Sequence, residues 1–183
     1  LVQSIGGGGG WNVLQGSNDD MVILGTLRGG TGHGGTVSVT NKAELSSQGP
    51  LSYGLVAQSI GGGGGAAGDG GRMSMLGSTK ASGDVHGGDI TITNSGTILT
   101  TGAHSAGLLS QSIGGGGGLA ADVNGATQLG SLSVVDGNQN AGAITITNSG
   151  KGIQTEGISA AALSAQSIGG GGGLVTAVAG ELV

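Results

Sequence analysis

The octapeptide QSIGGGGG occurs four times in this chain of 183 residues, without a changed letter, at 3–10, 58–65, 111–118 and 166–173. Glycine loses more conformational freedom on folding than any other residue, so five ordered glycines in a row need a structural reason that recurs with each copy. The copies begin 55, 53 and 55 residues apart. A fixed period of this length predicts a repeat architecture in which each unit packs on its neighbours.

A second landmark gives the same register. The stretches TVSVTN, DITITN and AITITN end at Asn41, Asn94 and Asn148. The 17 or 18 residues from this asparagine to the next glutamine of the octapeptide form a constant half, whereas the remainder of each period is variable. The expected organisation is a single domain: the end of a preceding repeat, three full repeats and the start of a following one, at 1–10, 11–65, 66–118, 119–173 and 174–183.

The constant half has the pattern of short strands. Ile90 and Ile92 alternate with Thr91 and Thr93, and this period of two predicts a half-buried strand. Two further strand-like stretches follow within each unit, separated by turn residues. The predicted fold class is all-β, a right-handed parallel β-helix (β-solenoid) of three tandem repeats of 53–55 residues, with like residues stacked at about 4.8 Å. The variable half is expected to add two more layers, or one layer and a projecting hairpin.

The composition agrees with packed strands. Glycine accounts for 47 residues and proline for 1, which disfavours long helices. Aromatic residues are 1% of the chain, so any core must be narrow and aliphatic. Hydrophobic residues at 36% and charged residues at 8% argue against disorder.

The charge and motif content exclude several function classes. A net charge of −5 with only 5 basic residues, spread singly, gives no basic patch that would bind nucleic acid. No apolar stretch is long enough for this segment to insert into a membrane. There is no cysteine, and no catalytic arrangement recurs, so neither an enzyme nor a cofactor or metal site is expected. The aspartates scatter through variable loops: Asp19, Asp20, Asp69, Asp84, Asp89, Asp122 and Asp136.

The histidines are interpreted as corner residues. His33 and His86 occupy matching positions, where stacked imidazoles suggest metal binding, but Asn140 replaces them in the third repeat. A solvent-facing corner is therefore the favoured interpretation. His104 aligns with Leu51 and Ser159 and is expected in a turn.

Repetition also predicts ladders of identical residues and a seam of glycines. The expected ladders are Asn41, Asn94 and Asn148; Gln58, Gln111 and Gln166; and Ile60, Ile113 and Ile168. Strand alternation places the isoleucines outward, as an exposed apolar stripe that needs a cover. The expected seam is Gly61, Gly65, Gly114, Gly118, Gly169 and Gly173. These glycines either form a tight corner that launches the variable half, or lie extended so that a neighbouring backbone comes close.

The unit ITITNSGTILTTGAHSAGLLSQSIGGGGG, at 90–118, resembles the repeat of large bacterial autotransporter (type V secretion) passenger domains. The resemblance implies a β-helix on the bacterial cell surface or secreted, structural or adhesive, with a host or surface receptor or a glycan as partner. NKAEL at 41–45 departs from the NSGTI pattern, which predicts a less regular turn.

Two further expectations concern partners. The alternative function is a self-assembling protein that forms extracellular filaments through stacked ends and the Gly/Ile seam, because open strand edges favour self-association. Trp11 and Tyr53 lie where an adhesin places recognition residues, or else they cover the flank of the fold.

Overall fold

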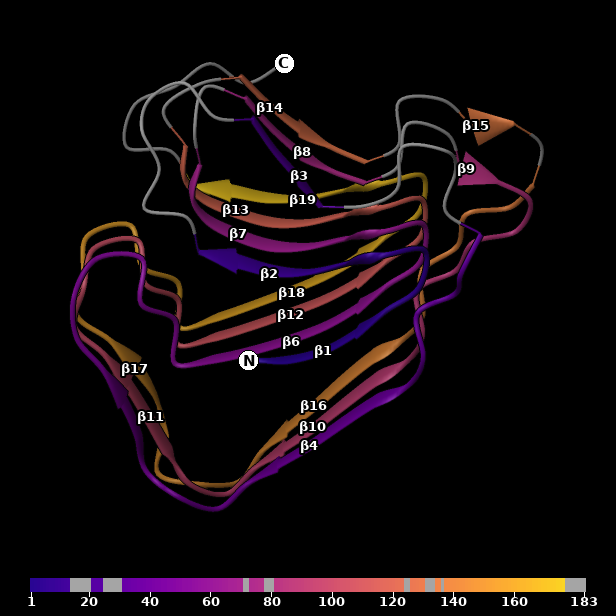
Figure 1. The fold of residues 1–183 in the computed structure, drawn as a ribbon. Helices are drawn as coiled ribbons and strands as arrows, with labels where there is room; N and C mark the ends of the chain where they lie inside the picture. Colours follow the sequence, from indigo (N-terminus) through magenta and orange to yellow (C-terminus); the bar gives the residue numbers. More distant parts are fainter. Residues whose placement is uncertain are drawn as a thin grey trace.

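The computed structural model describes eight stretches of the chain, 1–13, 21–24, 31–70, 73–77, 81–123, 126–130, 134–135 and 137–176. Within these residues the fold is all-β, without a helix. All the strand pairs are parallel, and the strands form six sheets (Figure 1). The predicted class, all-β with parallel strands, is confirmed and is compatible with a solenoid.

Three sheets come from the constant half. Sheet A contains β1 (Val2–Ile5), β6 (Leu55–Ile60), β12 (Leu108–Ile113) and β18 (Leu163–Ile168). Sheet E contains β4 (Val37–Asn41), β10 (Ile90–Asn94) and β16 (Ile144–Asn148). Sheet F contains β5 (Leu45–Ser47), β11 (Thr97–Thr100) and β17 (Gly152–Thr155).

The other three sheets follow the glycine runs. Sheet B contains β2 (Gly9–Val13), β7 (Gly64–Gly70), β13 (Gly117–Val123) and β19 (Gly172–Thr176). Sheet C contains β3 (Met21–Leu24), β8 (Met73–Leu76) and β14 (Ala126–Leu129). Sheet D contains β9 (Ala81–Ser82) and β15 (Val134–Val135).

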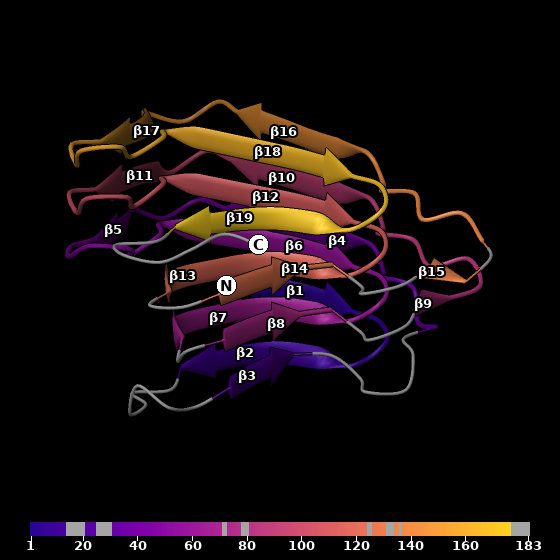
Figure 2. The same cartoon turned by 90° about the horizontal axis from the view of Figure 1, so that it is seen from above.

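Each repeat contributes one strand to each of sheets A, B, C, E and F and so forms one layer; the two strands of sheet D come from the second and third repeats. Ile90 pairs with Val37 in the preceding repeat and with Ile144 in the following one. Figure 2 shows the layers in the order of the repeats, with the colours running through the stack from one end to the other. The prediction of two or three layers per repeat is wrong, because the variable half pairs with its counterparts in adjacent repeats and not with its own constant half.

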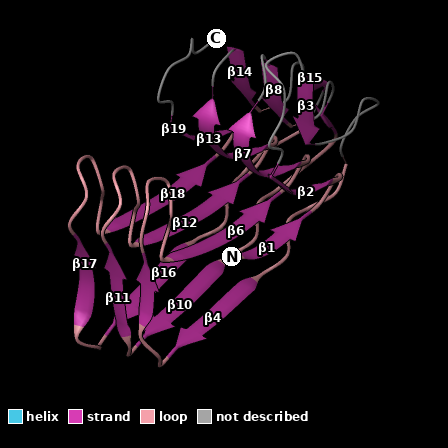
Figure 3. Cartoon of the chain, turned by 60° about the vertical axis from the view of Figure 1, so that its left-hand side comes forward, coloured by secondary structure: helices cyan, strands magenta, loops and turns pink. Residues whose placement is uncertain are grey.

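The constant half encloses the main core. Sheets A, E and F form the three-sided part of the fold (Figures 1 and 3). They surround a cluster of aliphatic side chains. The period-two prediction is confirmed in β10, where Ile90 and Ile92 are buried and Thr91 is exposed. The buried members of this core are Val37, Leu55, Ala57, Ile90, Ile92, Ile98 and Leu108.

Sheet A is covered on its second face as well. After the glycine run the chain turns back, so that sheet B lies over sheet A and sheet C lies over sheet B (Figure 1). Val56 and Leu109 of sheet A pack with Ala66 and Leu119 of sheet B. A smaller cluster with Leu76 joins sheets B and C.

Because sheet B covers the second face of sheet A, the isoleucines of the octapeptide are not in the exposed environment that the sequence predicts. Ile60 and Ile113 are fully buried and Ile168 is half-buried, so the predicted exposed stripe is not exposed. Val56, Gln58 and Ile60 share one face of β6, and sheet B covers that face. The chain therefore provides the cover itself, through its variable half.

Candidate functional site

The asparagine ladder joins the layers at the turn between sheets E and F. Asn41 Nδ2 donates to Asn94 Oδ1, and Asn94 Nδ2 donates to Asn148 Oδ1, each at 2.7 Å. The same nitrogens also donate to the turn, to Ala43 O at 3.0 Å and Gly96 O at 3.3 Å. Each amide thus holds its own turn and the next layer together.

The glutamine ladder lies between sheets A and B. Gln3 donates to Gln58 at 2.5 Å, Gln58 to Gln111 at 2.7 Å and Gln111 to Gln166 at 2.7 Å, in each case from Nε2 to Oε1. Gln58 and Gln111 are fully buried, where an unpaired amide is costly. Gln111 Nε2 also reaches Gly118 O in sheet B at 3.3 Å. The ladder therefore connects successive layers and connects the two sheets.

A serine ladder was missed by the sequence reasoning. Ser59 Oγ donates to Gly35 O at 2.7 Å and accepts from Gly88 N of the next layer at 2.8 Å. Ser112 repeats this with Gly88 O and Gly142 N, both at 2.8 Å. The serine of the octapeptide carries the signal, but its partners lie 24 to 30 residues away in a segment of low sequence identity.

The glycine seam combines the two expected roles. In each run the middle glycines turn the chain from sheet A to sheet B. In the second run φ is positive from Gly62 to Gly65, and Gly64 and Gly65 already belong to β7. The backbones of successive runs approach closely: Gly63 N donates to Gly6 O at 2.7 Å and Gly116 N donates to Gly61 O at 2.7 Å.

Close approach also explains why side chains are excluded from the seam. A Cβ on Gly65 would collide with the carbonyl oxygen of Gly10, and one on Gly118 with that of Gly65. The other predicted seam residues crowd further backbone carbonyls: Gly61 that of His86, Gly114 that of Asn140, Gly169 that of Gln139, and Gly173 that of Gly118.

The two aligned histidines stack between layers. The ring centroids of His33 and His86 are 5.1 Å apart, with 11° between the ring planes. His33 Nδ1 accepts from His86 N at 3.1 Å, and His86 Nδ1 accepts from Asn140 N at 3.2 Å. Among the described residues no group of three or more potential metal ligands gathers. The rings thus join backbone segments of adjacent layers at a partly exposed corner.

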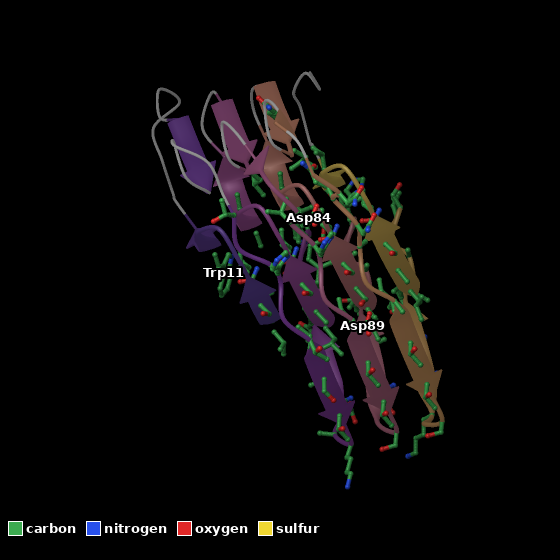
Figure 4. The ribbon with its side chains drawn as sticks, turned by 90° about the vertical axis from the view of Figure 1, so that its right-hand side faces the viewer. Trp11, Asp84 and Asp89 are labelled. Carbon is green, nitrogen blue, oxygen red and sulfur yellow. The ribbon has the colours of Figure 1, made fainter. Side chains whose placement is uncertain are left out.

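Two aspartates on the same flank have a comparable role. Asp84 accepts from Asn138 N at 2.7 Å, and Asp89 accepts from Ala143 N at 2.8 Å, each through Oδ1 (Figure 4). The remaining predicted acids, Asp19, Asp20, Asp69, Asp122 and Asp136, lie outside the residues whose side chains are described. His104, Leu51 and Ser159 share a left-handed turn conformation, with φ of 56°, 58° and 55°.

An apolar cavity of about 410 Å³ opens on the flank where sheet B meets the turns that precede sheet A. Trp11, Leu51, Tyr53, Ala66 and Leu119 are among its lining residues. A second cavity, of about 260 Å³, shares Tyr53 with the first. The Tyr53 hydroxyl lies 3.2 Å from Thr176 Oγ1, and burial raises the pKa of this phenol. Trp11 is 64% exposed and borders the cavity, whereas Tyr53 is partly buried against the cluster between sheets A and B.

Comparison with protein-family models, with curated proteins and with solved structures finds no match to this chain. No helix within the described part of the chain meets the length and hydropathy needed to cross a membrane. The fold and the ladders define an all-β repeat protein with parallel sheets, and they provide no constellation of reactive side chains within the residues described.

Proposed function

We propose that the chain is a segment of a right-handed parallel β-solenoid that acts as a structural or adhesive element of a bacterial autotransporter passenger, on the cell surface or secreted. The observation that carries the proposal is the one-layer repeat: each of the three periods adds one strand, in register, to sheets A, B, C, E and F. An array of this kind lengthens by adding repeats and leaves the contacts between layers unchanged. The handedness follows the general rule for parallel crossover connections.

Side-chain ladders support a stiff element. The asparagine, glutamine and serine side chains all form hydrogen bonds between adjacent layers. The chain has no cysteine, so the layers are joined by parallel strand pairing and by these ladders, and not by disulfides. The QSIGGGGG unit adds support through its resemblance to passenger-domain repeats.

A variant with one repeat duplicated, residues 66–118, tests the solenoid. Small-angle scattering should show a particle longer by about 4.8 Å for the added layer, with an unchanged cross-section. A larger cross-section would contradict the stacked arrangement. For the adhesive role, binding of the labelled chain to host-cell surfaces and glycan arrays is compared with that of a heat-unfolded sample, and equal binding by both would count against it.

Self-assembly into filaments is the second candidate. Strands β16 and β18 lie at the ends of their sheets, so one edge of each is unpaired within the described residues. Ile158 and Leu163, in the same layer, are 80% and 45% exposed. Open edges with exposed apolar groups favour pairing with another chain. Light scattering that reports a mass independent of concentration would exclude this function for the segment.

A further inference from the structure

The chain has a single tryptophan, a single tyrosine and no phenylalanine, and both aromatic residues line the same cavity. Trp11 belongs to β2, and Tyr53 lies in the turn before β6. Figure 4 shows Trp11 on the first layer, which forms one edge of the stack. A chain that lacks aromatic residues almost everywhere else thus concentrates them at one apolar opening.

The cavity lies where adjacent repeats place side chains of different size at corresponding positions. In sheet B, Ala66 pairs with Trp11 on one side and with Leu119 on the other, so a small side chain separates two large ones. Around Tyr53, the corresponding positions in the following repeats hold Ala106 and Ala161, which line the second cavity. Small residues in these two columns leave the space.

The walls indicate the chemistry of a ligand. None of the side chains that line the larger cavity is charged, and its polar side chains are those of Ser52 and Tyr53. The Tyr53 hydroxyl already has Thr176 as its partner. A charged or strongly hydrated ligand would lose its water here without new hydrogen bonds, whereas an apolar ligand would gain by burial. The volume lies in the range of small-molecule sites.

The positions of the lining residues favour an extended ligand over a compact ring. The two cavities share Tyr53, and their lining residues lie along the stack, from Trp11 in the first layer to Leu174 and Thr176 in the last described strand. We propose that this flank binds one acyl chain, seated against Leu51, Ala66 and Leu119 and bordered by Trp11. The acyl chain of a free fatty acid and that of a phospholipid present the same chemistry to these walls.

Trp11 makes the proposal directly testable, because the fluorescence of the only tryptophan reports occupancy. The probe is a fatty acid with bromine on its acyl chain, used below its aggregation concentration, and bromine quenches indole emission only in contact with it. The expected result is saturable quenching at one equivalent, reversed by the unbrominated fatty acid. Folded protein that shows no quenching, or quenching that does not saturate, would overturn the proposal.

Register provides a matched pair of variants. Ala66→Leu fills the cavity with the residue that Leu119 and Leu174 already place in this column, and it should weaken binding at least tenfold. Ser46→Leu adds the same side chain on sheet F, where Leu99 is the register partner, and should leave binding unchanged. Undiminished quenching in Ala66→Leu would refute the assigned site.

A second variant protects the test against misfolding. If circular dichroism shows that Ala66→Leu does not fold, Ala121→Leu enlarges another buried residue that lines the same cavity. Binding should again fall at least tenfold, and unchanged binding would contradict the proposal. Vesicles of brominated phospholipid distinguish the two sources: quenching by vesicles identifies a membrane lipid, and quenching by the fatty acid alone identifies a free acyl chain.

Discussion

The side-chain amide of Gln58 donates a hydrogen bond of 2.7 Å to that of Gln111, although 53 residues separate them in the sequence. Both amides are fully buried between sheets A and B. Each is fixed in one orientation, because a donor on one layer must face an acceptor on the next. The ladder therefore specifies the register of neighbouring repeats in addition to contributing stability.

Replacing the central amide tests this role. Gln111→Leu leaves the oxygen of Gln166 without its donor and the Nε2 group of Gln58 without its acceptor, and an unsatisfied buried polar group costs about 1–3 kcal/mol. We expect the free energy of unfolding to fall by about that amount in urea titrations. Ser46→Ala, at an exposed site in sheet F, is the control. A Gln111→Leu variant as stable as the parent would show that the ladder contributes nothing.

Gln139 allows the opposite test, in which removing a buried amide should stabilise the protein. Gln139 is 9% exposed, and neither of its amide atoms has a hydrogen-bond partner within the described structure. The preceding repeat places the fully buried Val85 at the corresponding position. Gln139→Val should therefore raise the free energy of unfolding by about 1–3 kcal/mol. The reciprocal change, Val85→Gln, should lower the free energy of unfolding. Equal shifts in the same direction for the two variants would show that the unpaired amide of Gln139 is not costly.

The sequence was sufficient to predict the strands of the constant half, the repeat and the identity of the stacked residues, because these follow from local alternation and from a fixed period. The number of layers per repeat was not predictable. A period of 53–55 residues fits one long turn as well as several short ones, and the variable half that decides between them has little recurrent pattern. Burial of Ile60 was missed for the same reason, since its cover comes from sheet B.

The cavity could not be predicted from the sequence either. Trp11 and Tyr53 are 42 positions apart, and only the register of sheet B shows that Ala66 lies beside Trp11. The serine ladder needs the same knowledge of which loop lies against which strand. Contacts between layers are thus predictable where both partners repeat, and unpredictable where one partner belongs to the variable half.

The glycine seam predicts a strong difference between two glycine-to-alanine changes. Gly117 and Gly170 both have positive φ, but a Cβ on Gly117 would collide with the carbonyl oxygen of Gly172, whereas one on Gly170 would meet no atom within 4 Å. Gly170→Ala should cost only backbone strain, about 1–2 kcal/mol. Gly117→Ala should cost clearly more, or prevent folding, as measured by thermal unfolding. Equal losses would mean that close approach does not explain the seam.

The left-handed turn before sheet A is a site for stabilisation. His104 adopts φ of 56°, a conformation that costs a residue with a side chain about 1–2 kcal/mol. Replacing His104 with glycine removes this strain, but part of the gain in stability is offset because glycine is more flexible in the unfolded state. His104→Gly should therefore raise the free energy of unfolding by up to about 1 kcal/mol. Ala103→Gly, one residue earlier and without positive φ, should lower it, and a loss in both variants would contradict the explanation.

The buried phenol of Tyr53 predicts a loss of stability at high pH. Its pKa is raised above the ordinary value of 10.0, first because burial disfavours the phenolate; the hydrogen bond with Thr176 acts in the opposite direction and is the weaker effect. Above pH 10 the unfolded chain releases the phenolic proton while the folded chain retains it, so the free energy of unfolding falls as the pH rises towards the folded-state pKa. Since Tyr53 is the only tyrosine, tyrosinate absorbance follows it directly. Tyr53→Leu removes this pH dependence, and tyrosinate forming in the folded protein at or below pH 10 would show that the phenol is not buried.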